Sequence, residues 1–305
     1  MSENVADEPS HGSVVIIGNF DGVHRGHVEL IRLARAAEPG ARLVAVTFWP
    51  HPMSVIRPDQ TPPLLTSLDR RKQLLRAAGV DEVVVVEFTS EVASWSPAQF
   101  VDSVIRPLNP ARIVVGENFR FGFRASGDVN TLADLGEGNF KVQAVPLVTD
   151  GSHPSSSTLI RHAVAEGDFG RVRELSDQVF RLQGIVVRGD QRGRQMGYPT
   201  ANIAVAPIMA LPADGVYAGW VTRLDVGSPR WPAAISVGTN PTFDGVERRV
   251  EAYVLDRTDL ELYGVEIAID FYARMRGQVK YEGMESLIKQ MHRDVEQIRE
   301  VLSEH

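Results

Sequence analysis

Two histidines, His24 and His27, stand where an apolar run gives way to a helical pattern. Residues 14–17 (VVII) predict a strand, and the apolar spacing of residues 27–37 (HVELIRLARAA) predicts a helix. Histidines three positions apart lie on one helix face, so both imidazoles can reach one phosphoryl group and stabilise its developing charge. Glycines in the loop let the backbone approach a ligand, and the unpaired N–H groups of a helix start favour phosphate. The alternative is a pair of surface histidines at an ordinary helix start.

A second group with chemical potential lies in the segment PTAN, which contains Thr200 and Asn202. These residues are two apart and therefore face the same side of an extended strand. A hydroxyl and an amide oxygen side by side suit Mg²⁺ bound with phosphate. Glu251 stands in the alternating segment 248–256. Its carboxylate can take a proton from an attacking hydroxyl if it points inward, whereas periodicity alone favours an outward, solvated acid.

Three further loops carry polar side chains at predicted strand or helix ends, and they are residues 47–52, 116–122 and 155–161. The first contains His51 between two prolines, and the second contains Asn118 and Arg120 among phenylalanines and glycines. The third has serine and threonine hydroxyls that can cap a helix or donate to phosphate, with Arg161 one turn later. Each loop has a purely structural alternative, namely a proline-rich turn, an aromatic turn and a helix cap. Because they recur at strand ends, we expect a single crevice.

The elements that must position these residues change in character near residue 182. Before it, apolar strands alternate with helical patterns, and we expect strands at 41–48, 81–88, 111–116 and 140–148 with helices at 67–78, 97–105 and 162–176. Such β-α-β units build a parallel sheet that binds ligands at the carboxyl ends of its strands. After it, short strands separated by turns predict a compact β-barrel, closed by an amphipathic helix at 283–302. The sequence thus predicts two domains, 1–182 and 183–305.

Composition narrows the classes of function. With 305 residues, two domains can each bury a core, and the net charge of −7 argues against wholesale nucleic-acid binding. The absence of cysteine excludes disulfides and thiolate catalysis. The polar N-terminus has no apolar signal region, and no apolar stretch approaches the length of a membrane span. We therefore expect a cytoplasmic protein with small-molecule partners, no nucleic acid and no membrane.

The His-x-Gly-His segment after a strand resembles the signature of the nucleotidyltransferase superfamily. More specifically, the ordered segments GNFDGVHRGH, TFWPHP, GENFRFG, SSSTLIR, GRQMGYPTANI, DGVYAGWV, SVGTNPTF, VEAYVLD and LIKQMHRD resemble the prokaryotic bifunctional riboflavin kinase/FMN adenylyltransferases, or FAD synthetases, from about residue 14 to 300. The resemblance implies an α/β Rossmann-like nucleotidyltransferase domain followed by a Greek-key β-barrel riboflavin kinase domain with a C-terminal helix.

The resemblance also implies two reactions and their substrates. The barrel would transfer the γ-phosphoryl group of ATP, with Mg²⁺, to riboflavin and form FMN. The N-terminal domain would join FMN to the α-phosphorus of a second ATP, giving FAD and pyrophosphate. Riboflavin, FMN, FAD and ATP are thus the expected substrates or products, and the resemblance leaves room for a homo-oligomer.

Site residues follow from the resemblance position by position. The catalytic set is His24, His27 and Glu251. The nucleotide- and phosphate-binding set is Gly18, Phe20, Asp21, Gly22, Asn118, Ser157, Thr158, Arg161, Gly193 and Gly197. The flavin-binding set is Phe48, Pro50, His51, Asn118, Arg120, Tyr217 and Arg276, and the metal-binding pair is Thr200 and Asn202. The chain departs from the family pattern at Leu159, where arginine is common, at Pro154 and Ser155, and at Tyr281, where phenylalanine is usual.

Three other functions remain open from sequence. In the first, only one of the two domains is active. The second is an adenylate-forming enzyme like the aminoacyl-tRNA synthetases, which predicts a basic tRNA-binding surface and conflicts with the acidic balance. The third is a flavin carrier without ATP turnover, which has no use for two histidines in a phosphate loop.

Overall fold

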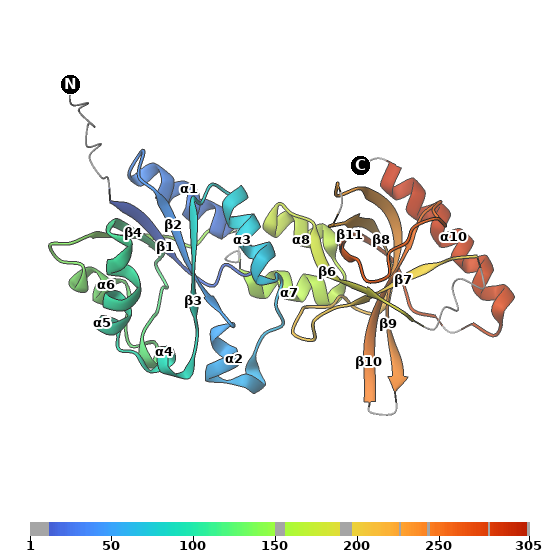
Figure 1. The fold of residues 1–305 in the computed structure, drawn as a ribbon, viewed down its shortest axis with the longest axis horizontal. Coiled ribbons are helices and arrows are strands. Elements are labelled where there is room, and N and C mark those ends of the chain that lie inside the picture. The colour runs from blue at the N-terminus through green and yellow to red at the C-terminus, as the bar shows by residue number, and fades with distance from the viewer. Residues whose placement is uncertain are drawn as a thin grey trace, which may run out of the picture. The chain divides into compact units, whose positions relative to one another are not determined.

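The computed structural model describes residues 12–149, 156–189, 197–225, 227–242, 245–279 and 281–303. The chain divides into two compact units, each with its own sheet (Figure 1). The first unit comprises Met1–Pro62 and Ser67–Ser156, and the second comprises Pro63–Thr66 and Ser157–His305.

The first unit is built on a five-stranded parallel sheet with the order β3-β2-β1-β4-β5. Its strands are β1 Ser13–Ile17, β2 Leu43–Trp49, β3 Glu82–Glu87, β4 Pro110–Gly116 and β5 Lys141–Val145. The central strand β1 is fully buried and apolar after its first residue, as expected for a strand covered on both faces. The strand order reverses beside β1, so the carboxyl ends of β1 and its two neighbours form the place where such sheets bind ligands.

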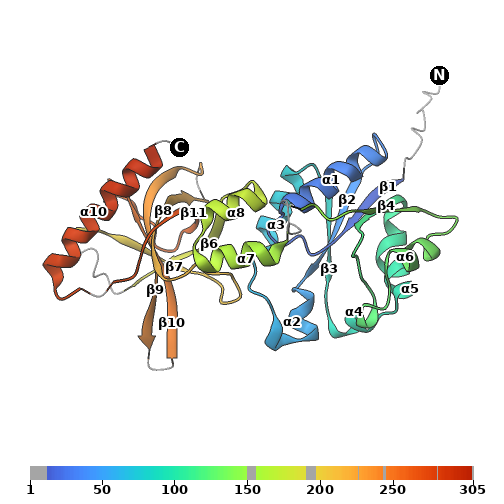
Figure 2. The same ribbon diagram turned by 180° about the vertical axis from the view of Figure 1, so that it is seen from behind.

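Helices cover both faces of this sheet. They are α1 Arg25–Ala37, α2 Pro52–Ile56, α3 Leu68–Ala77, α4 Ser90–Ser94, α5 Pro97–Phe100 and α6 Val129–Leu135, with short helical turns at Pro58–Gln60, Val101–Ile105, Arg106–Leu108 and Phe123–Ala125. One apolar core contains Ile31 and Leu75 from α1 and α3, and the other contains Phe100 and Leu132 from α5 and α6. Figure 2 shows this arrangement from behind. The predicted Rossmann-like α/β fold is confirmed.

Local sequence signals explain several helix boundaries. The Ser67 hydroxyl accepts a hydrogen bond from the Arg70 backbone N–H, and Ser96 forms a capping box with Gln99. The predicted helix at 97–105 is α-helical only to Phe100 and continues as a π-helical turn to Ile105. The predicted helical stretch 162–176 is interrupted, because Gly167 has φ +76° and Asp168 caps a new helix.

The second unit is a closed six-stranded antiparallel barrel with the order β10-β7-β6-β11-β8-β9. Its strands are β6 Phe180–Val187, β7 Thr200–Ala204, β8 Gly215–Arg223, β9 Arg230–Thr242, β10 Gly245–Val254 and β11 Glu266–Gly277. Strands β8, β9 and β10 are neighbours in sequence order, and β11 returns beside β8. This is Greek-key connectivity, and the predicted barrel is confirmed.

The described residues of the second unit also form the helices α7 Ser157–Glu166, α8 Phe169–Ser176 and α10 Met284–Ser303. Phe169 of α8 joins the barrel interior, where its ring lies 5.1 Å from that of Phe271. The amphipathic helix α10 covers the outer face, with Ile298 and Leu302 in a cluster with Trp220. The helices α7 and α8 belong to the second unit, and the division at 182/183 stays a prediction.

Candidate active sites

The loop between β1 and α1 is a tight turn with unusual backbone angles. Phe20 and Val23 have φ values of 50° and 38°, and Gly22 has 83°. Positive φ at non-glycine residues is costly and persists where surrounding structure enforces it. Here the Gly18 N–H donates to the Val46 carbonyl of β2 at 3.1 Å, and the Phe20 side chain is buried beneath the loop. The sheet therefore holds the turn in place.

The spacing of the two histidines predicts that they share one face, and in the structure their rings stack at the start of α1. His24 is the N-cap and His27 lies in the first turn, with ring centroids 3.7 Å apart and planes inclined by 24°. The Phe20 ring meets His27 edge-on at 5.1 Å. The Nδ1 atom of His27 is buried and has no hydrogen-bond partner among the described residues.

Burial is the main reason that the pKa of His27 lies well below its ordinary value of 6.5, and the neighbouring charges of His24 and Arg71 lower it further. The imidazole is therefore neutral near pH 7. A neutral ring at the N-terminus of α1 can donate one N–H to an oxygen that gains negative charge.

A buried arginine, which the sequence did not single out, lies beside this loop. Arg71 of α3 is fully buried, and its Nη2 lies 3.5 Å from the carboxylate of Asp21, which is 1% exposed. Its Nη1 donates to the Thr47 hydroxyl at 3.4 Å and to the Phe48 carbonyl at 3.3 Å. In the sequence SLDRRKQLL this arginine is one of three adjacent cations on a helix, so no local signal marks it as buried.

The end of β2 and the loop after it carry three of the predicted flavin-binding residues. Phe48 is partly buried in the strand, which ends at Trp49, and Pro50 and His51 follow in the loop. His51 is 6% exposed and caps α2, because its Nδ1 accepts a hydrogen bond from the Met53 N–H at 3.2 Å. This bond fixes the ring and leaves Nε2 as its other polar atom.

The loop after β4 presents Asn118 and Arg120 to solvent. The Arg120 guanidinium pairs with Asp128 at 3.0 Å, and the rings of Phe119 and Phe121 stack at 5.4 Å. Since β4 and β2 flank β1, the loops after all three strands lie at the same edge of the sheet.

Of the predicted phosphate loop SSSTLIR, residues 157–161 form the start of α7 in the second unit. Ser157 and Thr158 open the helix, and the Arg161 Nε donates to the Pro63 carbonyl at 2.7 Å. Pro154 and Ser155 lie outside the described residues. Phosphate binding by these groups stays a prediction.

The predicted kinase residues lie together on the outer face of the barrel. In β7 and β10, Ala201 and Ala252 point into the core, so Thr200, Asn202 and Glu251 point outward. Glu251 pairs in register with Asn202, and its Oε2 accepts a hydrogen bond from the Thr200 hydroxyl at 3.2 Å. Glu251 therefore points outward, as the periodicity of the strand favours. It is not a freely solvated acid, because its side chain is half-buried and accepts the hydrogen bond from Thr200.

Neighbouring residues shape the surroundings of these oxygens. Gly189 leaves room for the Asn202 amide, because a Cβ at position 189 would collide with it. On the other side of Glu251, Ser236 is its register partner in β9 and accepts a hydrogen bond from the Gln278 amide at 3.1 Å.

The two predicted flavin-binding residues of the second unit have different surroundings. Tyr217 is completely buried in the barrel core, and its hydroxyl donates to the Ala213 carbonyl at 2.5 Å. Arg276 makes bidentate hydrogen bonds of 2.9 and 2.6 Å to Asp294 of α10, and this partner raises the pKa of the arginine. Of the two predicted glycines, Gly197 is described with φ +84°, whereas Gly193 lies outside the described residues.

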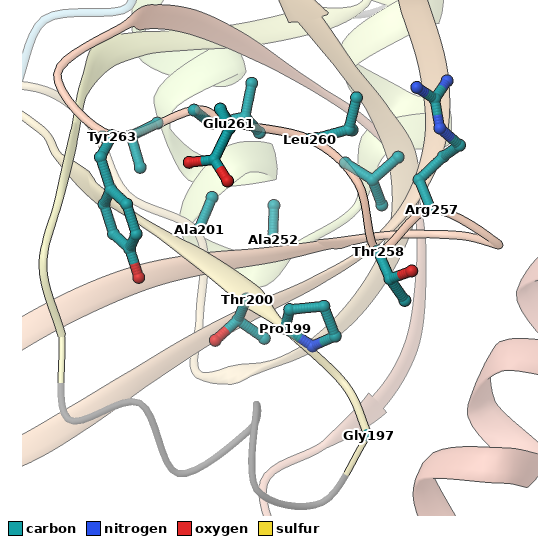
Figure 3. Close-up of a pocket in the computed structure, with 13 residues that line it drawn as sticks. Gly197, Pro199, Thr200, Ala201, Ala252, Arg257, Thr258, Leu260, Glu261 and Tyr263 are labelled. Carbon is teal, nitrogen blue, oxygen red and sulfur yellow. The ribbon is translucent and has the colours of Figure 1, made fainter.

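A cavity of about 330 Å³ adjoins Thr200 (Figure 3). Figure 3 shows Pro199 and Thr200 on one side of it and Leu260 and Glu261 on the other, with two small alanines between them. Its lining is Val186, Gly197, Pro199, Thr200, Ala201, Ala252, Val254, Arg257, Thr258, Leu260, Glu261, Leu262 and Tyr263. The loop residues 257–263 were not predicted as site residues, because the segment RTDLELY contains no recognisable phosphate or metal motif.

The fold and these sites define a nucleotidyltransferase sheet joined to a kinase barrel. The sequence model of FAD synthetase matches residues 6–159, and that of riboflavin kinase matches residues 176–302. The chain belongs to the bifunctional riboflavin kinase/FMN adenylyltransferase family.

Curated relatives with that name match almost end to end. The protein of Listeria monocytogenes is 35% identical over 94% of this chain and 91% of its own length. The protein of Bacillus subtilis is 34% identical, with 92% and 90% covered, and that of Escherichia coli K12 is 32% identical, with 95% and 93% covered.

A solved chain from Streptococcus pneumoniae, described as a macrolide-efflux protein, has a TM-score of 0.85 and 32% identity over 96% of this chain and 95% of its own. We transfer the fold but not that description, because both family matches and the curated relatives name flavin chemistry. Within the described ranges, no helix is both long and apolar enough to cross a membrane.

Proposed function

We propose that the two reactions of the family are carried out at two separate sites of this chain, one in each unit. The chain phosphorylates riboflavin with ATP to give FMN, and it adenylylates FMN with a second ATP to give FAD and pyrophosphate. The observation that carries the assignment of sites is the presence of two chemically different side-chain groups, the stacked imidazoles in the first unit and the Thr200–Glu251 pair in the second.

In adenylyl transfer, an FMN phosphate oxygen attacks the α-phosphorus of ATP, and the bond to the pyrophosphate oxygen breaks. His24 and His27 donate hydrogen bonds to the oxygens that gain charge in the transition state. The burial that keeps His27 neutral and the stack that fixes its ring support this role. Gly18, Phe20, Asp21 and Gly22 form the loop that admits the nucleotide phosphates to the N-terminus of α1.

In riboflavin phosphorylation, the ribityl 5′-hydroxyl attacks the γ-phosphorus, its proton passes to Glu251, and ADP leaves. The Thr200 and Asn202 oxygens would hold the Mg²⁺ that enters as part of the Mg-ATP substrate. Their donor set fits such an ion, because Mg²⁺ in kinases is held mostly by phosphates and water with few protein ligands.

The cavity beside Thr200 is the candidate pocket for the adenine of this ATP. Its alanine, valine and leucine side chains offer apolar surface to a flat ring, and Thr258 and Glu261 offer polar atoms at its edge. Thr200 borders both the cavity and Glu251, so one nucleotide can place its base in the cavity and its phosphates near the carboxylate.

The remaining predicted contacts stay proposals of the same kind. Phe48, Pro50, His51, Asn118 and Arg120 are assigned to FMN in adenylyl transfer, and Tyr217 and Arg276 to riboflavin. Ser157, Thr158, Arg161, Gly193 and Gly197 are assigned to nucleotide phosphates.

We assign the protein to the cytoplasm, where ATP is available, and expect no nucleic-acid partner because the net charge is −7. A homo-oligomer stays a prediction.

The proposal is tested by a chromatographic time course of riboflavin and Mg-ATP with the purified full chain. We expect FMN to appear first and then to be converted to FAD. FMN without FAD would remove the adenylyl assignment, and FAD formed only from added FMN would remove the kinase assignment.

A further inference from the structure

The buried cation Arg71 is the feature of the first unit that the proposed chemistry has not yet used. It comes from α3, which is neither the histidine loop nor the strand before it, and it is completely buried. Burying a guanidinium is costly unless charged and polar groups surround it, so the contacts that Arg71 makes must compensate for its lost hydration.

The contacts of Arg71 join three segments at the carboxyl edge of the sheet. Nη2 lies 3.5 Å from Asp21 in the β1–α1 turn, and Nη1 donates to the Thr47 hydroxyl and the Phe48 carbonyl at the end of β2. The guanidinium also lies 5.7 Å from the centre of the Trp49 ring. Thr47 in turn donates its hydroxyl to the Asn19 carbonyl at 3.1 Å, so the arginine supports the turn at two points.

We propose that Arg71 is a positioning residue for adenylyl transfer, which fixes the Asp21 turn and hence the His24–His27 stack at the start of α1. The rigid fork of arginine is suited to this task, because it directs several N–H groups at once toward acceptors on different segments. Its complete burial means that it acts through these groups rather than by touching the substrate.

The positive charge of Arg71 has a second effect on the same pair of histidines. The charged groups around His27 are His24 on its own loop and Arg71 on α3, whose charge is shared with Asp21. Arg71 helps to lower the pKa of His27, so its removal moves that pKa upward, and the Asp21 carboxylate, no longer balanced by Arg71, acts in the same direction. The hydrogen-bond geometry of Arg71 and its positive charge can therefore be tested separately, because one substitution can remove the geometry alone and another can remove both.

The experiment compares Arg71→Lys, Arg71→Met and the matched control Arg76→Met, an exposed arginine on the same helix. The kcat and KM for adenylylation of added FMN are measured in the full chain from pH 5.5 to 9. We expect Arg71→Met to lower kcat by about 100-fold and Arg71→Lys by about tenfold, because small misplacements of reacting groups have effects of this size. The KM for ATP should change by less than about threefold, and Arg76→Met should match the wild type.

The pH profile separates positioning from general support of the fold. In Arg71→Met, the acid limb of kcat and the NMR titration of the His27 ring should both move to higher pH, whereas Arg71→Lys keeps the charge and should leave both in place. Kinase activity on riboflavin should stay within about twofold in every variant, since its site lies in the other unit.

Several results would overturn the proposal. One is a kcat for Arg71→Lys equal to that of Arg76→Met. This result would show that the several N–H donors of the arginine side chain are not needed for adenylyl transfer. Another is an Arg71→Met protein that loses activity with no movement of the acid limb or of the His27 titration. If Arg71→Met does not fold, the Arg71→Lys result alone decides, because lysine retains the charge that Asp21 requires.

Discussion

The two candidate sites contain different kinds of polar side chain. In the first unit, a buried arginine, two stacked imidazoles and the N-terminus of α1 surround a loop whose backbone is held in an unusual conformation. In the second unit, the candidate groups are a hydroxyl, an amide and a carboxylate on the outer face of two strands. In the first group the arginine is balanced by the buried Asp21 carboxylate, whereas in the second the Glu251 carboxylate accepts a hydrogen bond from a neutral hydroxyl.

The difference matches what each reaction requires. Attack by an FMN phosphate needs no base, because the nucleophile is already an anion, so the first site can consist of hydrogen-bond donors. Attack by a hydroxyl needs a proton acceptor, and a carboxylate near the phosphates needs a cation to balance it. In the proposed mechanism, the second site would therefore need the Mg²⁺ that comes with ATP, whereas the first would rely on imidazole N–H groups and the N-terminus of α1.

The sharpest way to break this comparison is to remove His27. We expect His27→Ala to lower kcat for FMN adenylylation by at least about 100-fold, because an aligned donor to the developing charge is lost. Phosphorylation of riboflavin should be unchanged. Initial rates with FMN or riboflavin as the sole flavin measure the two reactions independently, and an equal loss in both would contradict the assignment to separate sites.

A reciprocal change is Glu251→Gln, which keeps the size of the side chain and removes its basicity. Riboflavin phosphorylation should fall by about 100-fold, within the range typical of a lost general base, while adenylylation of added FMN continues. Stopped assays at saturating Mg-ATP give the kcat. If the glutamine variant retains kinase activity, another group must accept the proton.

The cavity offers a smaller and more selective change. Thr258→Tyr places a ring at the edge of the cavity and should raise the KM for ATP in the kinase reaction by several-fold, with adenylylation unaffected. Ser303→Tyr, on the exposed last turn of α10, is the matched control in the same unit. An equal KM in the two variants would show that the nucleotide base binds elsewhere.

The smallest expected effect is on stability. The pKa of His27 is lowered in the folded chain, so the unfolded chain takes up its proton first as the pH falls below 6.5, and folding loses free energy from there downward. His27→Gln should remove this part of the acid sensitivity. Hydrogen exchange of the β1 and α1 amides from pH 7.5 to 5 measures the opening free energy, and identical pH slopes in the variant and the wild type would contradict the lowered pKa.

Much of this arrangement follows from sequence because its signals are local. The run VVII, the glycines and the two histidines predict a strand, a turn and a helix start, and the serines at 67 and 96 mark helix caps that the structure contains. Alternation in β7 and β10 predicts which residues share a face. Each of these inferences depends on neighbours within a few positions.

The parts that sequence could not give depend on distant contacts. Arg71 lies in a run of cations typical of a solvated helix face, and its burial follows only from the packing of α3 against the ends of β1 and β2. The bond between Thr200 and Glu251 joins residues far apart in the chain and requires the strand register. The cavity is likewise formed by a loop that approaches β7 only in the closed barrel.

The most direct test of two independent sites is a mixture of the His27→Ala and Glu251→Gln chains supplied with riboflavin and Mg-ATP. When each is assayed alone, the His27→Ala chain should accumulate FMN, and the Glu251→Gln chain should leave riboflavin unchanged. Together they should produce FAD, because FMN made by one chain is adenylylated by the other. A mixture that still produces no FAD, although each chain keeps its own remaining reaction in separate assays, would contradict two sites that work independently.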